Sequence, residues 1–132
     1  MTACMVGWSH TKFGKLAGED PESLIVRVAS DAIADAGVAP ADIDAIDLGF
    51  YNGGLSAQDF GASLVLQADD ALRFKPATRV ENACATGSAA MHQAVNYLDA
   101  KRGRLVLVVG VEKMTDRSEE HTSELQSRRT IV

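Results

Sequence analysis

The sequence predicts an α/β domain in which helices cover a mainly parallel central sheet. Short apolar segments alternate with longer ones whose apolar residues recur at helical spacing, which is typical of layered α/β folds. The clearest strand, Arg104 to Glu112, is an apolar run bounded by charge, as in central parallel strands covered on both faces. The segment before it, Cys84 to Arg102, is largely apolar and rich in small residues, which predicts a helix buried on several sides.

The elements before residue 81 follow in order along the chain. Residues 3–8 are apolar and predict a short strand. Pro21 then begins a helix, for which Asp20 is a suitable N-cap and Gly37 a suitable C-cap. The remaining predictions are a helical turn over 40–43, a strand over 45–51, a helix over 57–68 that Gly61 weakens, and a strand over 76–80.

Composition and charge exclude several classes of protein. The 132 residues are 46% apolar and 23% charged, as in globular domains. No apolar run reaches the roughly 20 residues that cross a bilayer, and the N-terminus lacks a signal-peptide pattern. The net charge of -5 provides no basic surface for nucleic acid or for an anionic membrane. With two cysteines and no metal-ligand spacing, we expect a cytoplasmic protein with reduced thiols and no metal.

Cys84 lies where the predicted strand that ends near Val80 turns into the long helix. The start of a helix favours the thiolate form of a cysteine, which is the form that attacks, because unpaired N–H groups and the helix dipole stabilise the anion. Small neighbours such as Ala83 and Gly87 let a substrate approach the backbone. These residues alone also allow a buried structural cysteine, which is the commoner role of an unpaired one. Cys4, on the predicted first strand, is expected to be structural.

A segment around this cysteine resembles the nucleophile segment of the thiolase family. It reads RVENACATGSAA from Arg79 to Ala90, and is most similar to the sterol-carrier-protein-type and acetyl-CoA acetyltransferase-like branch. Thr11–Lys15 and Val108–Met114 resemble two further stretches of that family in the same order and spacing, so the resemblance covers residues 3–116. It implies the thiolase-like layered fold, N-terminal half only, with Cys84 on a buried nucleophile helix.

The resemblance implies acyl transfer in two steps. Cys84 takes an acyl group from an acyl-CoA or 3-ketoacyl-CoA and passes it to a second thioester or to free CoA. Its backbone N–H is one donor to the oxyanion, and Asn82 and Gly87 are expected to support the turn. Coenzyme A thioesters are then substrates, with no bound cofactor. The full-length protein would be a homodimer that binds neither nucleic acid nor membrane.

The resemblance also places the general-base histidine, a second acid/base residue, an oxyanion-hole glycine and the CoA-binding loops after residue 116. His92 cannot replace the base, because eight residues along a helix is about 12 Å and proton transfer needs ~3 Å. We therefore expect residues 1–116 to be a truncated, inactive N-terminal domain. Two alternatives stay open: a fragment of a ketoacyl-synthase-type condensing enzyme, and a non-catalytic thiolase-like protein that binds lipids or thioesters.

The last segment, residues 117–132, has a different character. It shows no apolar periodicity, and the run RSEEHTSELQS from Arg117 to Ser127 is what a common sequencing adapter encodes when it is read as codons. We predict an artefactual tail, disordered or weakly structured, that carries no function. Sequencing the gene beyond the codon for Asp116 checks this, and an intact gene that encodes the tail would contradict it.

Overall fold

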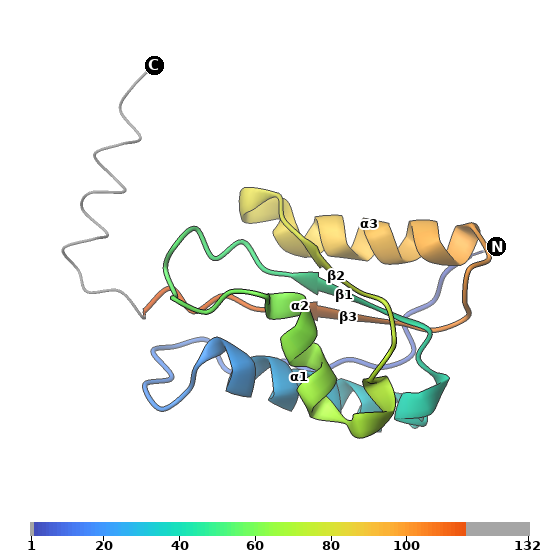
Figure 1. Ribbon diagram of the computed structural model, residues 1–132, viewed down its shortest axis with the longest axis horizontal. Helices are drawn as coiled ribbons and strands as arrows, with labels where there is room; N and C mark the ends of the chain where they lie inside the picture. Colours follow the sequence, from blue (N-terminus) through green and yellow to red (C-terminus); the bar gives the residue numbers. More distant parts are fainter. Residues whose placement is uncertain (1, 116–132) are drawn as a thin grey trace, which may run out of the picture.

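The computed structural model describes residues 2–115 and contains a parallel three-stranded sheet between two helical layers (Figure 1). β1 (Ala45–Gly49) is the central strand, and β2 (Ala77–Val80) and β3 (Val106–Gly110) pair with it on either side. α3 (Thr86–Asp99) covers one face, and α1 (Pro21–Ala36) and α2 (Gly61–Leu64) cover the other. Single 3-10 turns lie at Pro40–Asp42, Val65–Ala68, Asp70–Leu72 and Ala83–Ala85. The predicted α/β class with a parallel sheet is confirmed.

α1 begins and ends where its local sequence predicts. Asp20 and Ser23 form a capping box, in which Ser23 N–H donates to Asp20 Oδ1 at 2.7 Å and Asp20 N–H donates to Ser23 Oγ at 3.0 Å. The Ser23 N–H that bonds the carboxylate holds the pKa of Asp20 below its ordinary value. At the other end, Gly37 takes the left-handed conformation (φ 64°) that ends the helix.

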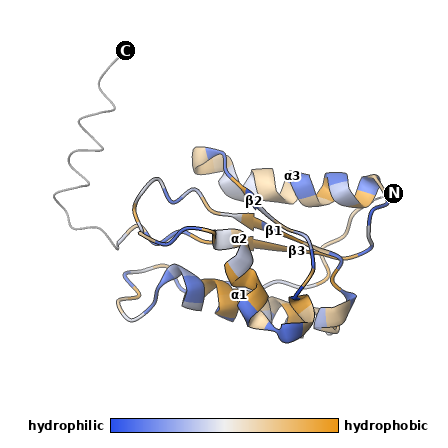
Figure 2. Ribbon diagram, viewed as in Figure 1, coloured by the Kyte–Doolittle hydropathy of each residue, from blue (hydrophilic) through white to orange (hydrophobic). Residues whose placement is uncertain are grey.

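The hydrophobic core lies mainly between the sheet and the layer of α1 and α2. Its largest fully buried side chains are Phe50, Ile25, Ile43, Ile46, Leu48, Leu72 and Val65. Every residue of β1 is buried, because helices cover both of its faces and strands cover both of its edges. Figure 2 shows the strongest apolar colour on the sheet, α1 and α2, whereas α3 is paler. The layer of α1 and α2 therefore contributes most of the apolar packing.

Asp47 places a carboxyl group in the middle of this buried strand. Its side chain is 4% exposed, and its partners in register are Thr78 and Val108. It shares the α3-facing side of β1 with Gly49, because alternate residues of a strand face the same side and Gly49 lies against Thr86. Burial raises the pKa of Asp47 above its ordinary value, since a low-dielectric site disfavours the charged form.

Asp47→Asn is expected to stabilise the chain at neutral pH. With a raised pKa, the folded state binds the proton more tightly than the unfolded state, so stability falls as the pH rises above 3.8 and levels off above the folded-state pKa. The asparagine carries no charge, so we expect a gain of about 1 kcal/mol at pH 7 that shrinks toward zero as the pH approaches 3.8. Urea unfolding followed by circular dichroism from pH 4 to pH 8 measures this.

The exposed Asp31 on α1 provides the control, because Asp31→Asn removes the same charge without relieving burial. A gain for Asp47→Asn that does not change with pH, or one that Asp31→Asn reproduces, would contradict the explanation.

The predicted strand over residues 3–8 is wrong. This segment is mostly exposed, and its backbone forms no ladder with any strand of the described chain. A strand needs a hydrogen-bonded neighbour, and none of the strands present pairs with this segment. Cys4 is therefore exposed rather than structural, and its Sγ donates to Thr2 O at 3.8 Å.

The predicted helix over 84–102 and the predicted strand over 104–112 are shorter and less covered than expected. The helix predicted over 84–102 begins at Thr86 and buries one face only, through Thr86, Ala90 and Ala94. β3 lies at the edge of the sheet: within residues 2–115 it pairs with β1 alone, and its residues alternate between half-buried and buried up to the exposed Gly110. Within residues 2–115, α3 has the sheet on one side only, so the expected burial of this helix on several sides fails.

Two other predictions concern the helix over 57–68 and the end of the chain. The predicted helix is broken into the short α2 and the 3-10 turn Val65–Ala68, and it starts only at Gly61. The predicted tail over 117–132 lies outside the described residues.

No helix of residues 2–115 is both long and apolar enough to span a membrane.

Candidate active site

Cys84 lies in the connection between β2 and α3, which we call the cysteine turn (residues 81–86). A single 3-10 turn over Ala83–Ala85 contains the cysteine, and α3 begins directly after it. The predicted turn from strand to helix is confirmed, but the cysteine precedes the first residue of α3 by two positions and is not on the helix itself. The residue is exposed, so its thiol is accessible to a reactant.

The cysteine turn packs on the carboxyl end of the central strand. A Cβ added to Gly49 would lie 3.2 Å from Thr86 Cγ2 and 3.2 Å from Thr86 O, so the glycine permits this close approach. In open α/β sheets, ligands bind beyond the carboxyl ends of the strands. Cys84 therefore lies at the edge of the sheet where folds of this class build their sites.

Ala83, the residue before the cysteine, has a left-handed backbone with φ 45°. This conformation suits glycine, and it costs a residue with a Cβ about 1–3 kcal/mol. It turns the chain sharply between β2 and α3, as the nucleophile elbow does in other folds. The strained residue thus presents Cys84 at the surface of the turn.

Side-chain hydrogen bonds hold the cysteine turn in this shape. Ala83 N–H donates to Glu81 Oε1 at 2.9 Å. Thr86 Oγ1 accepts from Asn82 N–H at 2.9 Å and donates to Ala83 O at 2.7 Å. Sequence reasoning missed the part played by Thr86. The available signal was a threonine just after a turn, where a hydroxyl can bond to nearby backbone groups.

The other residues predicted at the site have the following positions. Asn82 is exposed and enters the turn through its backbone, while its side chain caps no helix N–H. Gly87 is exposed in the first turn of α3, and a Cβ there would meet nothing within 4 Å, which leaves open space close to Cys84. Their supporting roles stay predictions. His92 is exposed on α3, as expected of a surface histidine.

A second set of contacts fixes the loop that follows β1. Glu112 accepts from Tyr51 N–H at 2.5 Å and from Asn52 N–H at 3.1 Å. Arg79 donates to Phe50 O at 2.7 Å and to Tyr51 O at 2.9 Å, and its guanidinium lies 5.2 Å from the centre of the Phe50 ring. An anion from the end of β3 and a cation from β2 thus hold the same loop. The carboxyl ends of all three strands are joined where the cysteine turn lies.

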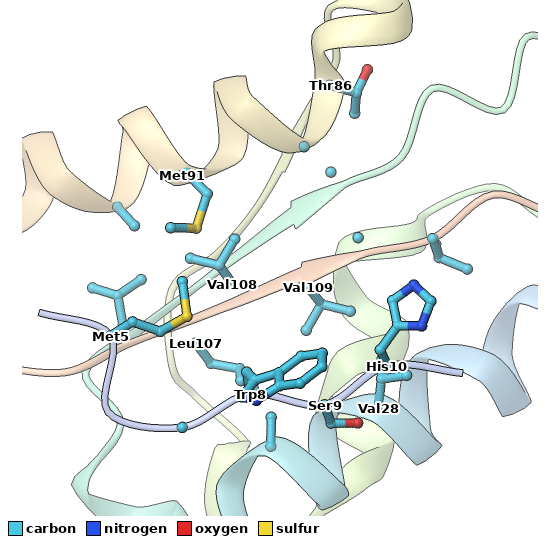
Figure 3. Close-up of a pocket in the computed structure, with 18 of the residues that line it drawn as sticks. Met5, Trp8, Ser9, His10, Val28, Thr86, Met91, Leu107, Val108 and Val109 are labelled. Carbon is cyan, nitrogen blue, oxygen red and sulfur yellow. The ribbon is translucent and has the colours of Figure 1, made fainter. Parts of the chain in front are cut away.

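A groove of about 1570 Å³ runs from the cysteine turn along β3. Figure 3 shows Met91 of α3 on one wall, Met5 and Trp8 of the N-terminal segment on the other, and Val108 of β3 between them. Cys84 also lines the groove. An accessible thiol therefore borders a mostly apolar channel.

Comparison with known sequences connects the chain to one family. The family described as Thiolase, N-terminal domain matches residues 3–131. This range includes most of the segment after Asp116, and the artefactual origin of that segment stays a prediction. The acetyl-CoA acetyltransferases of Methanocaldococcus jannaschii and Methanothermobacter thermautotrophicus are 42% and 37% identical over 113 and 112 residues. Each alignment covers 85% of this chain and 29% of the relative, so the chain spans less than a third of these relatives.

Two solved structures share the fold. The acetyl-CoA acetyltransferase of Syntrophomonas wolfei has a TM-score of 0.73 and 23% identity, covering 90% of this chain and 31% of that chain. The 3-oxoacyl-[acyl-carrier-protein] synthase III of Aquifex aeolicus VF5 has a TM-score of 0.61 and 22% identity. The match covers 77% of this chain and 34% of the synthase chain. At these identities the likeness shows the fold alone. The family match over nearly the whole chain shows the relationship: this chain belongs to the thiolase family.

Proposed function

We propose that this chain is the N-terminal, nucleophile-bearing part of an acyl-CoA acyltransferase that carries the acyl group as a thioester on Cys84. The cysteine turn carries the proposal, because it presents an exposed thiol from a strained backbone at the carboxyl end of a parallel sheet. Membership of the thiolase family and two acetyl-CoA acetyltransferase relatives support a CoA thioester as the acyl donor.

In the acylation step, the Cys84 thiolate attacks the carbonyl carbon of the CoA thioester. A carbon–sulfur bond forms to Cys84 and the bond to the CoA sulfur breaks, so CoA leaves as a thiolate that takes up the proton lost by Cys84. Negative charge develops on the carbonyl oxygen before CoA leaves. The Cys84 N–H donates to no backbone or side-chain acceptor within residues 2–115, which supports its role as one oxyanion donor.

The remaining parts of the proposal concern the full-length protein. CoA or a second thioester takes the acyl group from Cys84, with no metal or bound cofactor, in lipid metabolism. The general base and the CoA-binding loops lie after residue 116, so this chain alone does not turn over. We propose a cytoplasmic homodimer, and the two free cysteines of the chain support a reducing location.

Acylation of Cys84 in the full-length protein tests the proposed function. After incubation with acetyl-CoA and digestion, mass spectrometry is expected to show one acetyl group on the peptide that contains Cys84. The exposed Cys4 is the internal control, and its peptide should stay unmodified. Cys84→Ala is expected to remove the adduct and lower turnover by about 10³-fold or more. An unmodified Cys84 peptide together with full activity of Cys84→Ala rejects the proposal.

The same experiment separates a second candidate, a ketoacyl-synthase-type condensing enzyme. The fold likeness to the Aquifex aeolicus synthase favours keeping it. Once Cys84 is acetylated, malonyl-acyl-carrier-protein and free CoA are offered in parallel as acceptors. Condensation with loss of CO2 from the malonyl thioester identifies the synthase, and transfer of the acetyl group to free CoA without loss of CO2 identifies the acyl-CoA acyltransferase.

A further inference from the structure

We propose that Thr86 and Glu81 are positioning residues for Cys84. They hold Ala83 in its left-handed conformation and thereby set the direction of the thiol and of the Cys84 N–H. The inference rests on the proposed function, in which Cys84 is the nucleophile. Neither side chain has to touch the reacting atoms, because both act through the peptide groups on either side of Ala83.

Hydrogen bonds hold Ala83, the strained residue, through both its N–H and its carbonyl oxygen. Its N–H donates to Glu81 Oε1 at 2.9 Å. Its carbonyl oxygen accepts from the Thr86 hydroxyl at 2.7 Å and also from the Thr86 backbone N–H. Backbone bonds on both sides restrict φ and ψ together. Without them, Ala83 is free to relax from φ 45° toward the negative φ that a residue with a Cβ prefers, and Cys84 would move with it.

Thr86 also connects the turn to the rigid part of the molecule. The residue is 6% exposed and packs against the position where Gly49 lacks a Cβ, at the end of the central strand. Its hydroxyl accepts from Asn82 N–H while it donates to Ala83 O, so one oxygen joins two successive residues of the turn. The turn therefore has a fixed position relative to the sheet.

The bond from Thr86 has a direct chemical consequence for the oxyanion donor. The carbonyl of Ala83 and the N–H of Cys84 belong to the same peptide group. Because a peptide group is planar, holding the carbonyl oxygen on one side directs the N–H to the opposite side. A hydrogen bond to the carbonyl also polarises the group and strengthens its N–H as a donor. Thr86 thus orients the donor that the proposed transition state requires.

The main test compares two substitutions of Thr86 in the full-length protein. Thr86→Val keeps the shape of the side chain and removes both hydroxyl bonds, whereas Thr86→Ser keeps the hydroxyl. We expect Thr86→Val to lower the maximal rate of Cys84 acetylation by about 10-fold or more, with little change in the acetyl-CoA concentration that gives half of that rate. Thr86→Ser is expected to stay within about twofold of the wild-type rate, because serine keeps the hydroxyl that donates to Ala83 O.

A rescue experiment distinguishes positioning from a general loss of packing. Glycine adopts positive φ as readily as negative φ, so Ala83→Gly added to Thr86→Val is expected to restore a large part of the rate. A loss of core packing would not be repaired by this change. Glu81 is exposed, so Glu81→Ala leaves the core intact and is expected to slow acetylation several-fold. Asp31→Asn, which removes an exposed acid from α1, is the matched control and should leave the rate unchanged.

Alkylation of Cys84 by iodoacetamide provides a readout that needs no acyl transfer. If wild-type Cys84 is not acetylated, the proposed function fails, and the alkylation rate and its pH profile still test the positioning. Thr86→Val is expected to change both, and Thr86→Ser neither. Equal alkylation and acetylation in Thr86→Val and wild type, or no rescue by Ala83→Gly, overturns the inference. If Thr86→Val does not fold, unchanged alkylation in Glu81→Ala overturns it.

Discussion

Gly110→Lys in β3 is expected to convert a self-associating chain into a monomer. Leu105 O accepts from Asp44 N–H, and Val111 N–H donates to Gly49 O, so the odd-numbered residues of this region direct their backbone groups toward β1. The N–H and C=O groups of Val106, Val108 and Gly110 therefore face the free edge. Within the described part of the chain they have no strand partner. An unpaired, apolar edge of this kind recruits another strand.

The occupant that we expect at this edge is a second copy of the chain. The groove beside β3 adds apolar surface to it, including Met5 and Trp8, which are 71% and 66% exposed. A lysine at position 110 has room, since a Cβ there meets nothing within 4 Å. A lysine on each edge places positive charge on both partners, and the repulsion is expected to lower the association constant by about 10-fold or more.

Size-exclusion chromatography with light scattering at micromolar concentration measures the effect. Ser30→Lys on the exposed side of α1 is the control, because it adds the same charge away from the edge and should leave association unchanged. A wild-type chain that is monomeric and melts cooperatively would contradict the prediction.

Phe50→Ala is expected to cause the largest loss of stability in the chain. The Phe50 side chain is 0% exposed, and its Cδ1 lies 2.7 Å from where a Cβ on Gly61 would be, so it packs directly against α2. The Arg79 guanidinium lies over its ring and adds a cation–π contact. Removing a buried phenylalanine costs about 3–5 kcal/mol, which is a large part of the roughly 5–15 kcal/mol that stabilises a domain.

Urea unfolding followed by circular dichroism measures this loss, in the Gly110→Lys background so that the chain stays monomeric. Phe50→Leu is the matched variant. It keeps a large apolar side chain, so its loss in the free energy of unfolding should be clearly smaller than that of Phe50→Ala. A loss below about 1 kcal/mol for Phe50→Ala would show that the ring is not part of the core, since such values are typical of surface substitutions.

Local signals in the sequence predicted the elements that depend on local interactions. Asp20, Pro21 and Gly37 bounded α1 correctly, because a capping box and a left-handed glycine act within a few residues. Residues 3–8 have a strand-like sequence, but a strand depends on a partner from elsewhere in the chain, and none of the described strands pairs with them. β3, an apolar run as strong as any in the sequence, has only β1 as a partner among the described strands.

The candidate site also combines features that can be predicted from the sequence with features that cannot. Cys84 was identified from its neighbours and from the family resemblance, and both use only the order of residues. The part played by Thr86 depends on the backbone conformation of Ala83 and on the contact with Gly49, which is 37 positions earlier in the chain (86 − 49 = 37). Neither feature produces a pattern in the sequence. Family resemblance pointed to Cys84 as the proposed nucleophile, and the structure was needed to show which contacts hold the cysteine turn.

The central strand β1 is also the first strand of the sheet to be synthesised. Ile46 of β1 pairs with Ala77 of β2, which is 31 residues later in the chain (77 − 46 = 31). It also pairs with Leu107 of β3, which is 61 residues later (107 − 46 = 61). At about 5–20 residues per second, β1 waits roughly 3–12 seconds on the ribosome for its last partner. During that interval Ile46 and Leu48 are not yet covered by the rest of the sheet. A nascent chain of this protein is therefore expected to need chaperone protection until β3 has left the exit tunnel.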